Sequence, residues 1–165
     1  MDASRLNRGE QIAGIAGVVL LLSMWIFDWF SVSAAGGIGP SFGGNAWEVF
    51  SVIDIVIFLT AIAAIALAAM AASASEVNVP VAMSALTTGL GILAVILIII
   101  RIISPPDGGF GDLIDVSTSF GVWLGLVASA AVAYGGWTAM QEEGTSFGGQ
   151  VGPRTAPPPP PPPAA

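Results

Sequence analysis

Four long apolar segments constrain the fold of this chain more than any other feature. They cover residues 12–30, 49–72, 81–103 and 120–140. A helix rises about 1.5 Å per residue and the hydrocarbon core of a bilayer is about 30 Å thick, so about 20 residues are needed to cross it. The sequence therefore predicts an all-α membrane protein with four transmembrane helices, formed by residues 1–140.

The composition indicates the same class of protein. Of the 165 residues, 55% are hydrophobic and only 9% are charged, which leaves too little charged surface for a water-soluble domain. Cys and His are both absent, which excludes disulfides, thiolate nucleophiles and the usual ligands of transition metals. We therefore expect no metal site and no cofactor. The sequence also has no Ser-His-Asp set and no phosphate-binding glycine loop, so we do not expect an enzyme.

The charges predict the orientation of the chain. The net charge of -7 arises from eleven acidic residues and four arginines, a balance that excludes a nucleic-acid partner. Arg5 and Arg8 precede the first segment and Arg154 lies in the C-terminal tail, whereas neither long connection contains a basic residue. By the positive-inside rule, both termini should lie in the cytoplasm. Aromatic residues gather near the predicted outer interface: Trp25, Trp29, Phe30, Trp47 and Phe50.

The connections between the segments read as loops. "SVSAAGGIGPSFGGN" is rich in Gly and Ser, and "SPPDGGFGDLIDVSTS" begins with a proline pair that ends the third helix. The acidic stretch "DGGFGDLID" lacks the alternating ligands of a calcium loop and is predicted to be solvated. The link around "SASEVNVP" is short, and short links favour antiparallel neighbours. An up-down-up-down bundle is the simplest topology.

The first segment has a competing interpretation as a cleaved signal peptide. Arg5 and Arg8 would form its charged region, and "VSA" at residues 32–34 would precede the cleavage site. Cleavage would leave three spans. We favour a retained helix, because the apolar core is long for a signal sequence and Asp28 lies close before the site.

Residues 141–165 form a Gly-rich and Pro-rich tail that ends in "PRTAPPPPPPPAA". Such a run cannot join a core and favours an extended polyproline II conformation, so we predict a disordered cytoplasmic tail. A sharper hypothesis is a docking peptide for a protein partner. Arg154 followed by Pro157 and Pro160 has the spacing of a proline-rich ligand with a basic specificity residue.

Small residues at a spacing of four mark helix faces that can approach closely in lipid. The fourth segment carries such a stripe: Gly121, Gly125, Ser129 and Ala133. Shorter stripes occur in the first and third segments: Ala13 with Gly17, and Ala85 with Gly89. Packing within the bundle is the favoured interpretation. Formation of a homo-oligomer through the fourth helix is the alternative.

Three charged residues should converge near the outer ends of the helices. Asp54 lies in the apolar run "SVIDIVIFL" and shares its helix face with alanines, so it should point inward, away from lipid. Arg101 lies near the outer end of the third segment, and Asp28 near that of the first. We expect Asp54 and Arg101 to form an interhelical ion pair. The pair would fix helix neighbours or, alternatively, line an ion or proton pathway.

Three stretches carry a resemblance: "RLNRGEQIAGIAGVVLLLSMWIFDWF", "NAWEVFSVIDI" and "GVWLGLVASAAVAYGGW". Together they resemble small four-helix integral membrane proteins of actinobacterial type that have no assigned function, over nearly the whole chain except the proline tail. The resemblance implies a plasma-membrane location and a four-helix topology. It implies no catalytic or binding residues.

Two functional hypotheses follow from the sequence. The first is a non-enzymatic membrane scaffold or interaction protein that acts through its tail and its helix faces. The second is a small transport, channel or sensing component that uses the cluster of Asp54, Arg101 and Asp28 in the outer leaflet.

Overall fold

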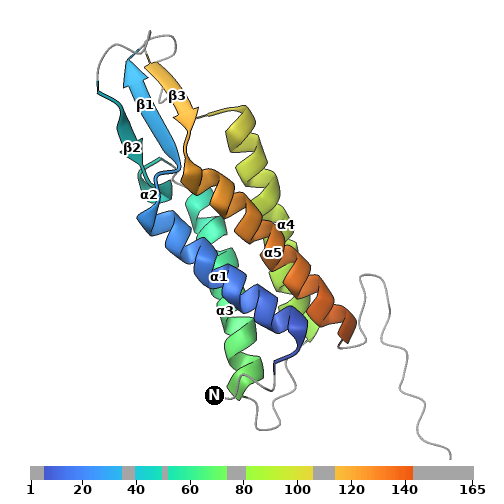
Figure 1. The fold of residues 1–165 in the computed structure, drawn as a ribbon. Coiled ribbons are helices and arrows are strands. Elements are labelled where there is room, and N and C mark those ends of the chain that lie inside the picture. Colours follow the sequence, from blue (N-terminus) through green and yellow to red (C-terminus); the bar gives the residue numbers. More distant parts are fainter. Residues whose placement is uncertain (1–5, 35–39, 50–51, 74–80, 106–113, 143–165) are drawn as a thin grey trace, which may run out of the picture.

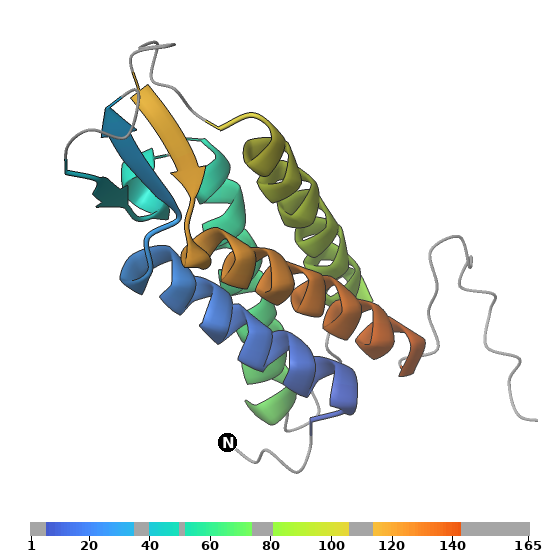
Figure 2. The same cartoon turned by 45° about the horizontal axis from the view of Figure 1, so that its top comes forward.

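The computed structural model describes residues 6–34, 40–49, 52–73, 81–105 and 114–142. Four long helices lie side by side, and each is long and apolar enough to cross a membrane (Figures 1 and 2). They are α1 (Arg8–Ile26), α3 (Ile53–Ser73), α4 (Val81–Ile103) and α5 (Phe120–Glu142), and a short helix, α2 (Ala46–Val49), precedes α3. The prediction of four helices that are long and apolar enough to span a membrane is confirmed.

A three-stranded antiparallel sheet stands at one end of the bundle, which we call the sheet end (Figure 1). Its strands are β1 (Phe30–Ala34), β2 (Phe42–Gly44) and β3 (Ile114–Thr118), in the order β2-β1-β3. Phe30 pairs with Gly44 on one side and with Thr118 on the other.

The sheet corrects the sequence prediction, which gives loops to both connections and an all-α class to the whole chain. The strand sequences "FSVSA" and "IDVST" do alternate between larger apolar and small or polar residues. They are too short and too far apart for the pairing to be read locally. The first helix also ends at Ile26 rather than at residue 30, because Phe30 begins β1.

A cap explains why α1 begins before its apolar run. Glu10 N donates to Asn7 Oδ1 at 2.7 Å, and Asn7 N donates to Glu10 Oε2 at 2.9 Å. This reciprocal pair is a capping box, which satisfies two backbone donors of the first turn. The polar turn is thereby included in the helix.

Glycines define how the helices meet. Gly9 near the start of α1 lies against Ala139 near the end of α5, while Gly121 at the start of α5 lies against Asp28, just after α1. On the other side of α1, Gly17 lies against Ala64 of α3. The start of α1 therefore lies beside the end of α5, and every long helix has close neighbours in the bundle.

The core has two parts of different character. At the sheet end it contains large side chains such as Trp29, Phe30 and Met24. Towards the opposite end it is built from smaller ones, among them Ala13, Ala16, Ala64, Leu67 and Val132. Large side chains fill the core beneath the sheet, whereas small ones let the helices approach closely.

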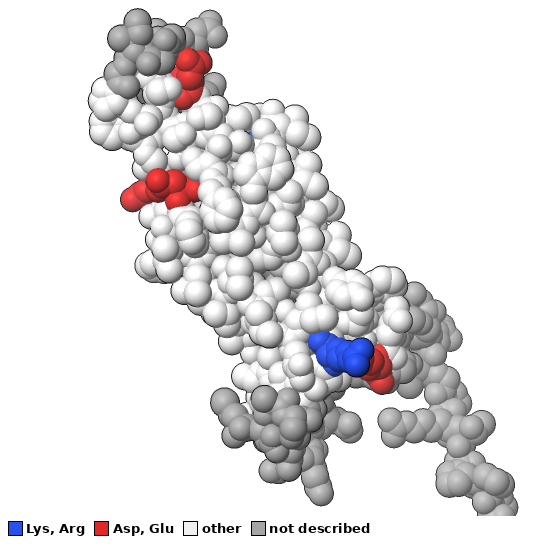
Figure 3. Space-filling model, in the orientation of Figure 1, with Lys and Arg blue, Asp and Glu red and all other residues white. Residues whose placement is uncertain are grey.

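Apolar side chains also cover the outside of the bundle. Exposed aliphatic residues occur on all four long helices: Ile15, Val18, Leu22, Ile55, Leu59, Ile62, Ile92, Ile96, Ile99 and Val127. On the face drawn in Figure 3, the coloured charged residues lie towards the ends, and the broad middle of the surface is white. Water-soluble proteins rarely expose an apolar surface this continuous, whereas lipid accepts it.

Candidate functional site

Asp54 lies in the first turn of α3 with its side chain completely buried. The prediction that it faces inward is therefore confirmed. Neither Oδ1 nor Oδ2 has a hydrogen-bond partner within the described part of the chain. Since buried carboxylates almost always accept hydrogen bonds, this residue needs a functional or structural explanation.

Arg101 lies in the last turn of α4, partly buried, and interacts electrostatically with Asp54. The structure thus brings these two residues near one another, as expected. The two hydrogen bonds of a bidentate pair are not present between them, because the Asp54 oxygens accept none from the described residues. A direct ion pair stays a prediction.

Asp28 lies apart from this buried site, in the exposed turn between α1 and β1. Its backbone oxygen accepts a hydrogen bond from Gly121 N at 3.0 Å, and its carboxylate lies against Gly43 of β2. The carboxylate of Asp28 is at the surface while that of Asp54 is fully buried. That the three charges lie near one level stays a prediction, and the charged group that acts on Asp54 is Arg101.

Hydroxyl groups between α3 and α4 extend the site beyond its charged residues. Thr60 Oγ1 lies 2.8 Å from Val56 O and 3.2 Å from Leu90 O, so it links the two helices. Thr87 is fully buried on α4, and its Oγ1 has no hydrogen-bond partner among the described residues. We call the following set the polar seam: Asp54 and Thr60 of α3 with Thr87 and Arg101 of α4.

A sequence signal for the seam does exist. Thr87 and Arg101 lie on the same side of α4 at helical spacing, together with the buried Gly91 and Ala94. The pattern gives the shared face but does not give the hydrogen bonds. These depend on which side-chain rotamer each threonine adopts against α3.

The predicted small-residue stripe of α5 lies within the bundle. Gly121 and Gly125 lie against the indole of Trp29, whose Nε1 donates to Ser23 O at 2.9 Å. Ser129 Oγ donates to Gly125 O at 2.8 Å. These contacts occupy the sheet-end half of the stripe with groups of the same chain.

The remaining small residues differ between two faces of α4. Ala133 of α5 lies against Gly91 of α4, so close contact is made there. Gly89 is exposed and, among the described atoms, nothing lies within 4 Å of the position that its Cβ would take. The interpretation of Gly89 as a packing residue is therefore wrong, because its helix face points out of the bundle.

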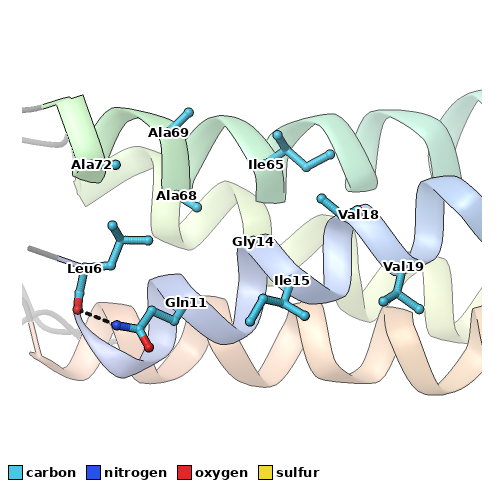
Figure 4. A pocket seen from close by; sticks show the side chains of 10 residues that line it. All are labelled: Leu6, Gln11, Gly14, Ile15, Val18, Val19, Ile65, Ala68, Ala69 and Ala72. Carbon is cyan, nitrogen blue, oxygen red and sulfur yellow. Dashed lines mark hydrogen bonds between the residues drawn. The ribbon is translucent and has the colours of Figure 1, made fainter. Parts of the chain in front are cut away.

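An open groove of about 670 Å³ runs between α1 and α3 (Figure 4). Its walls include Gly14, Ile15 and Val18 of α1 and Ala68 of α3, and Gln11 lies at one end, where its Nε2 donates to Leu6 O. Apart from Gln11, the lining side chains are apolar. The groove has the chemistry of a surface in contact with lipid and not that of a catalytic cleft.

The sheet presents a polar face. Ser31 Oγ and Ser117 Oγ lie 2.9 Å apart, and Ser33 Oγ donates to Asp115 O at 3.4 Å. Residues on neighbouring positions of the strands, Phe30 and Val116, belong to the core instead. This alternation gives the sheet one face towards the bundle and one hydroxyl-rich face away from it.

Other predicted sites cannot be placed. Arg154, Pro157 and Pro160 of the tail lie outside the described residues. Within the described ranges, no group of three or more acidic side chains is arranged to hold a metal ion.

None of the protein-family models, curated proteins and solved structures with which the chain was compared matches it.

Proposed function

We propose that this chain is an integral protein of the plasma membrane that spans the lipid four times in an up-down-up-down arrangement. Both termini lie in the cytoplasm, and the sheet lies on the outer side. The observation that carries the proposal is the apolar belt on the outside of all four long helices. Lipid is the partner of that belt, because such a surface would associate non-specifically in water.

Exposed aromatic residues near both ends of the bundle support the proposed positions of the two membrane–water interfaces. Near the sheet end, exposed aromatic rings form edge-to-face pairs, with centroids 5.9 Å apart for Trp25 and Trp47 and 5.6 Å apart for Phe27 and Phe120. Trp137 is exposed near the other end of α5. Phe120 and Trp137 are separated by about 26 Å along the helix, close to the thickness of about 30 Å of the hydrocarbon core. Aromatic rings prefer such interfaces.

Within this arrangement, we infer a non-enzymatic scaffold or interaction role in which the polar face of the sheet contacts a protein partner. Ser31, Ser33 and Ser117 display hydroxyl groups on β1, which follows α1, and on β3, which precedes α5. A hydroxyl-rich face favours adaptable polar contacts with another protein. The groove between α1 and α3, by contrast, offers no group that could perform acid-base or nucleophilic chemistry.

The absence of cysteine from the sequence makes the orientation easy to test. We expect Ser41→Cys, exposed just before β2, to react in intact cells with a maleimide that cannot cross membranes. Glu142→Cys, exposed at the end of α5, should react only after the cells are permeabilised. The reverse pattern would overturn the orientation, and labelling of both residues in intact cells would overturn the four-span topology.

The interaction role is tested by placing a photo-crosslinking amino acid at Ser117 on the sheet or at Val127, which is exposed on α5. We expect a discrete protein adduct from position 117 and lipid adducts from position 127. Lipid adducts from both positions would contradict the proposal, because they would place the sheet in the bilayer. Absence of any protein adduct at 117 would contradict the interaction role.

A further inference from the structure

Thr87 is an unusual buried threonine. In a helix, a threonine hydroxyl normally donates to the carbonyl oxygen one turn earlier. Thr60 does this with Val56 O and Thr88 with Ser84 O, both at 2.8 Å. Thr87 Oγ1 is buried and makes no such bond in the described part of the structure. A hydroxyl group is thus left available inside the polar seam.

Thr60 contacts α4 at a point that lies between the two unpartnered groups, the Asp54 carboxyl and the Thr87 hydroxyl. Its hydroxyl lies 3.2 Å from Leu90 O, one helical turn along α4 from Thr87. Asp54 lies about 9 Å from Thr60 along α3, towards the sheet end, at about 1.5 Å per residue. The seam therefore contains the buried carboxyl of Asp54 on the sheet-end side of Thr60 and the buried hydroxyl of Thr87 on the other side. Neither group has a protein partner among the described residues.

Two classes of ligand could account for an unpartnered buried carboxyl, namely a metal cation and a proton. A hard cation needs several oxygen ligands at once, and no suitable acidic group surrounds Asp54 within the described chain. The positive charge of Arg101 also acts on Asp54 and opposes a second cation. A proton requires only one carboxyl oxygen, so the geometry favours the proton.

The other charged groups that the structure describes at the sheet end do not belong to this site. Asp28 is exposed and lies against Gly43, and Asp115 is exposed on β3. Glu48 of α2 is exposed, and its Oε2 accepts a hydrogen bond from Asn45 N. On α4, the charged group that acts on Asp54 is Arg101.

We propose that Asp54 is a proton-binding site, in exchange with water that enters the polar seam from the sheet end. The step is a reversible transfer in which the O–H bond of the Asp54 carboxyl breaks and a water molecule becomes hydronium, so no oxidant or further reactant is required. Among the described residues, Arg101 is the charged group that acts on Asp54. This site goes beyond the proposed scaffold role and does not depend on it.

The test is infrared spectroscopy of the full-length protein in lipid vesicles as the pH is varied. We expect the carbonyl stretching band of a buried protonated carboxylic acid, which disappears as the pH rises and is absent from Asp54→Asn. The matched control Asp28→Asn should keep the band. A carboxyl that stays ionised at every pH, or a band that survives Asp54→Asn, would overturn the proposal.

Two further variants keep the test decisive if Asp54→Asn fails to fold. Arg101→Gln should change the pH at which the band disappears, because it removes the charge that acts on Asp54. Ser129→Ala, which removes a buried hydroxyl on α5 bonded to Gly125 O, is the matched control and should leave that pH unchanged. A band whose pH dependence is unaffected by Arg101→Gln would place the carboxyl outside the polar seam and refute the site.

Discussion

The interface between α1 and α5 and that between α3 and α4 use opposite means to join two helices. Between α1 and α5 the backbones touch: a Cβ at Gly135 would lie 2.5 Å from Ala13 N and 2.8 Å from Gly9 O. Between α3 and α4, the hydroxyl of Thr60 crosses to Leu90 O, and buried polar groups remain without partners in the described chain. Contacts between α3 and α4 are also sparser than those between α1 and α5.

The difference indicates that one helix interface stabilises the bundle while another holds the polar site. Lipid provides little hydrophobic driving force between helices, so stability depends on close packing and interhelical hydrogen bonds. The α1–α5 interface provides the close packing, down to backbone contact at Gly135. The α3–α4 interface can then hold Asp54, whose burial costs free energy, because the fold is secured elsewhere.

The largest loss of unfolding free energy should come from disrupting the α1–α5 interface at Trp29. This side chain is fully buried and covers Gly121 and Gly125. Trp29→Ala should lower the free energy of unfolding by about 3–5 kcal/mol, because it removes contacts and leaves a cavity. Denaturant unfolding in detergent micelles measures the change. Trp123→Ala, at a half-exposed position on α5, is the control, and an equal loss there would contradict the prediction.

A smaller effect is expected at the point of backbone contact. Gly135→Ala places a methyl group against Ala13 N, which the α1 backbone can accommodate only by moving away. Such overpacking should cost about 1–3 kcal/mol of unfolding free energy. The same unfolding measurement applies.

Gly89 provides the matched control for Gly135. It also lies in a long helix, but open space surrounds its Cβ position in the described structure. Gly89→Ala should be neutral or stabilising by up to about 1 kcal/mol, because alanine favours a helix more than glycine does. Equal losses at both glycines would show that the α1–α5 contact is not especially tight.

The smallest changes in unfolding free energy are expected at the α3–α4 interface. Thr60→Val removes the hydroxyl that reaches Leu90 O and should cost about 0.6 kcal/mol, the average for such bonds in a membrane. Thr87→Val should be neutral or stabilising, because it removes a buried hydroxyl that has no protein partner in the described chain. The two variants have the same change in shape, so comparing their unfolding free energies isolates the bond. A larger loss at Thr87 would indicate a protein partner for its hydroxyl.

The bundle was largely predictable, and the site was predictable in part. The third apolar segment was predicted at residues 81–103 and forms α4, Val81–Ile103. The inward orientation of Asp54 followed from helical periodicity and from the cost of placing a charge in lipid. The exposure of Asp28 depends on the turn after α1, because the helix ends at Ile26 and Asp28 then lies beside Gly43 of β2.

By itself, the sequence determined that four apolar helices form and which faces carry small residues, because both depend on local composition and period. Only the tertiary structure decided that β1 pairs with β3, since Val32 and Val116 meet through a pairing that no local pattern encodes. It also decided that the α5 glycines receive Trp29 at one end and the α1 backbone at the other. Small residues permit close approach, but the partner that approaches is chosen by how the whole chain packs.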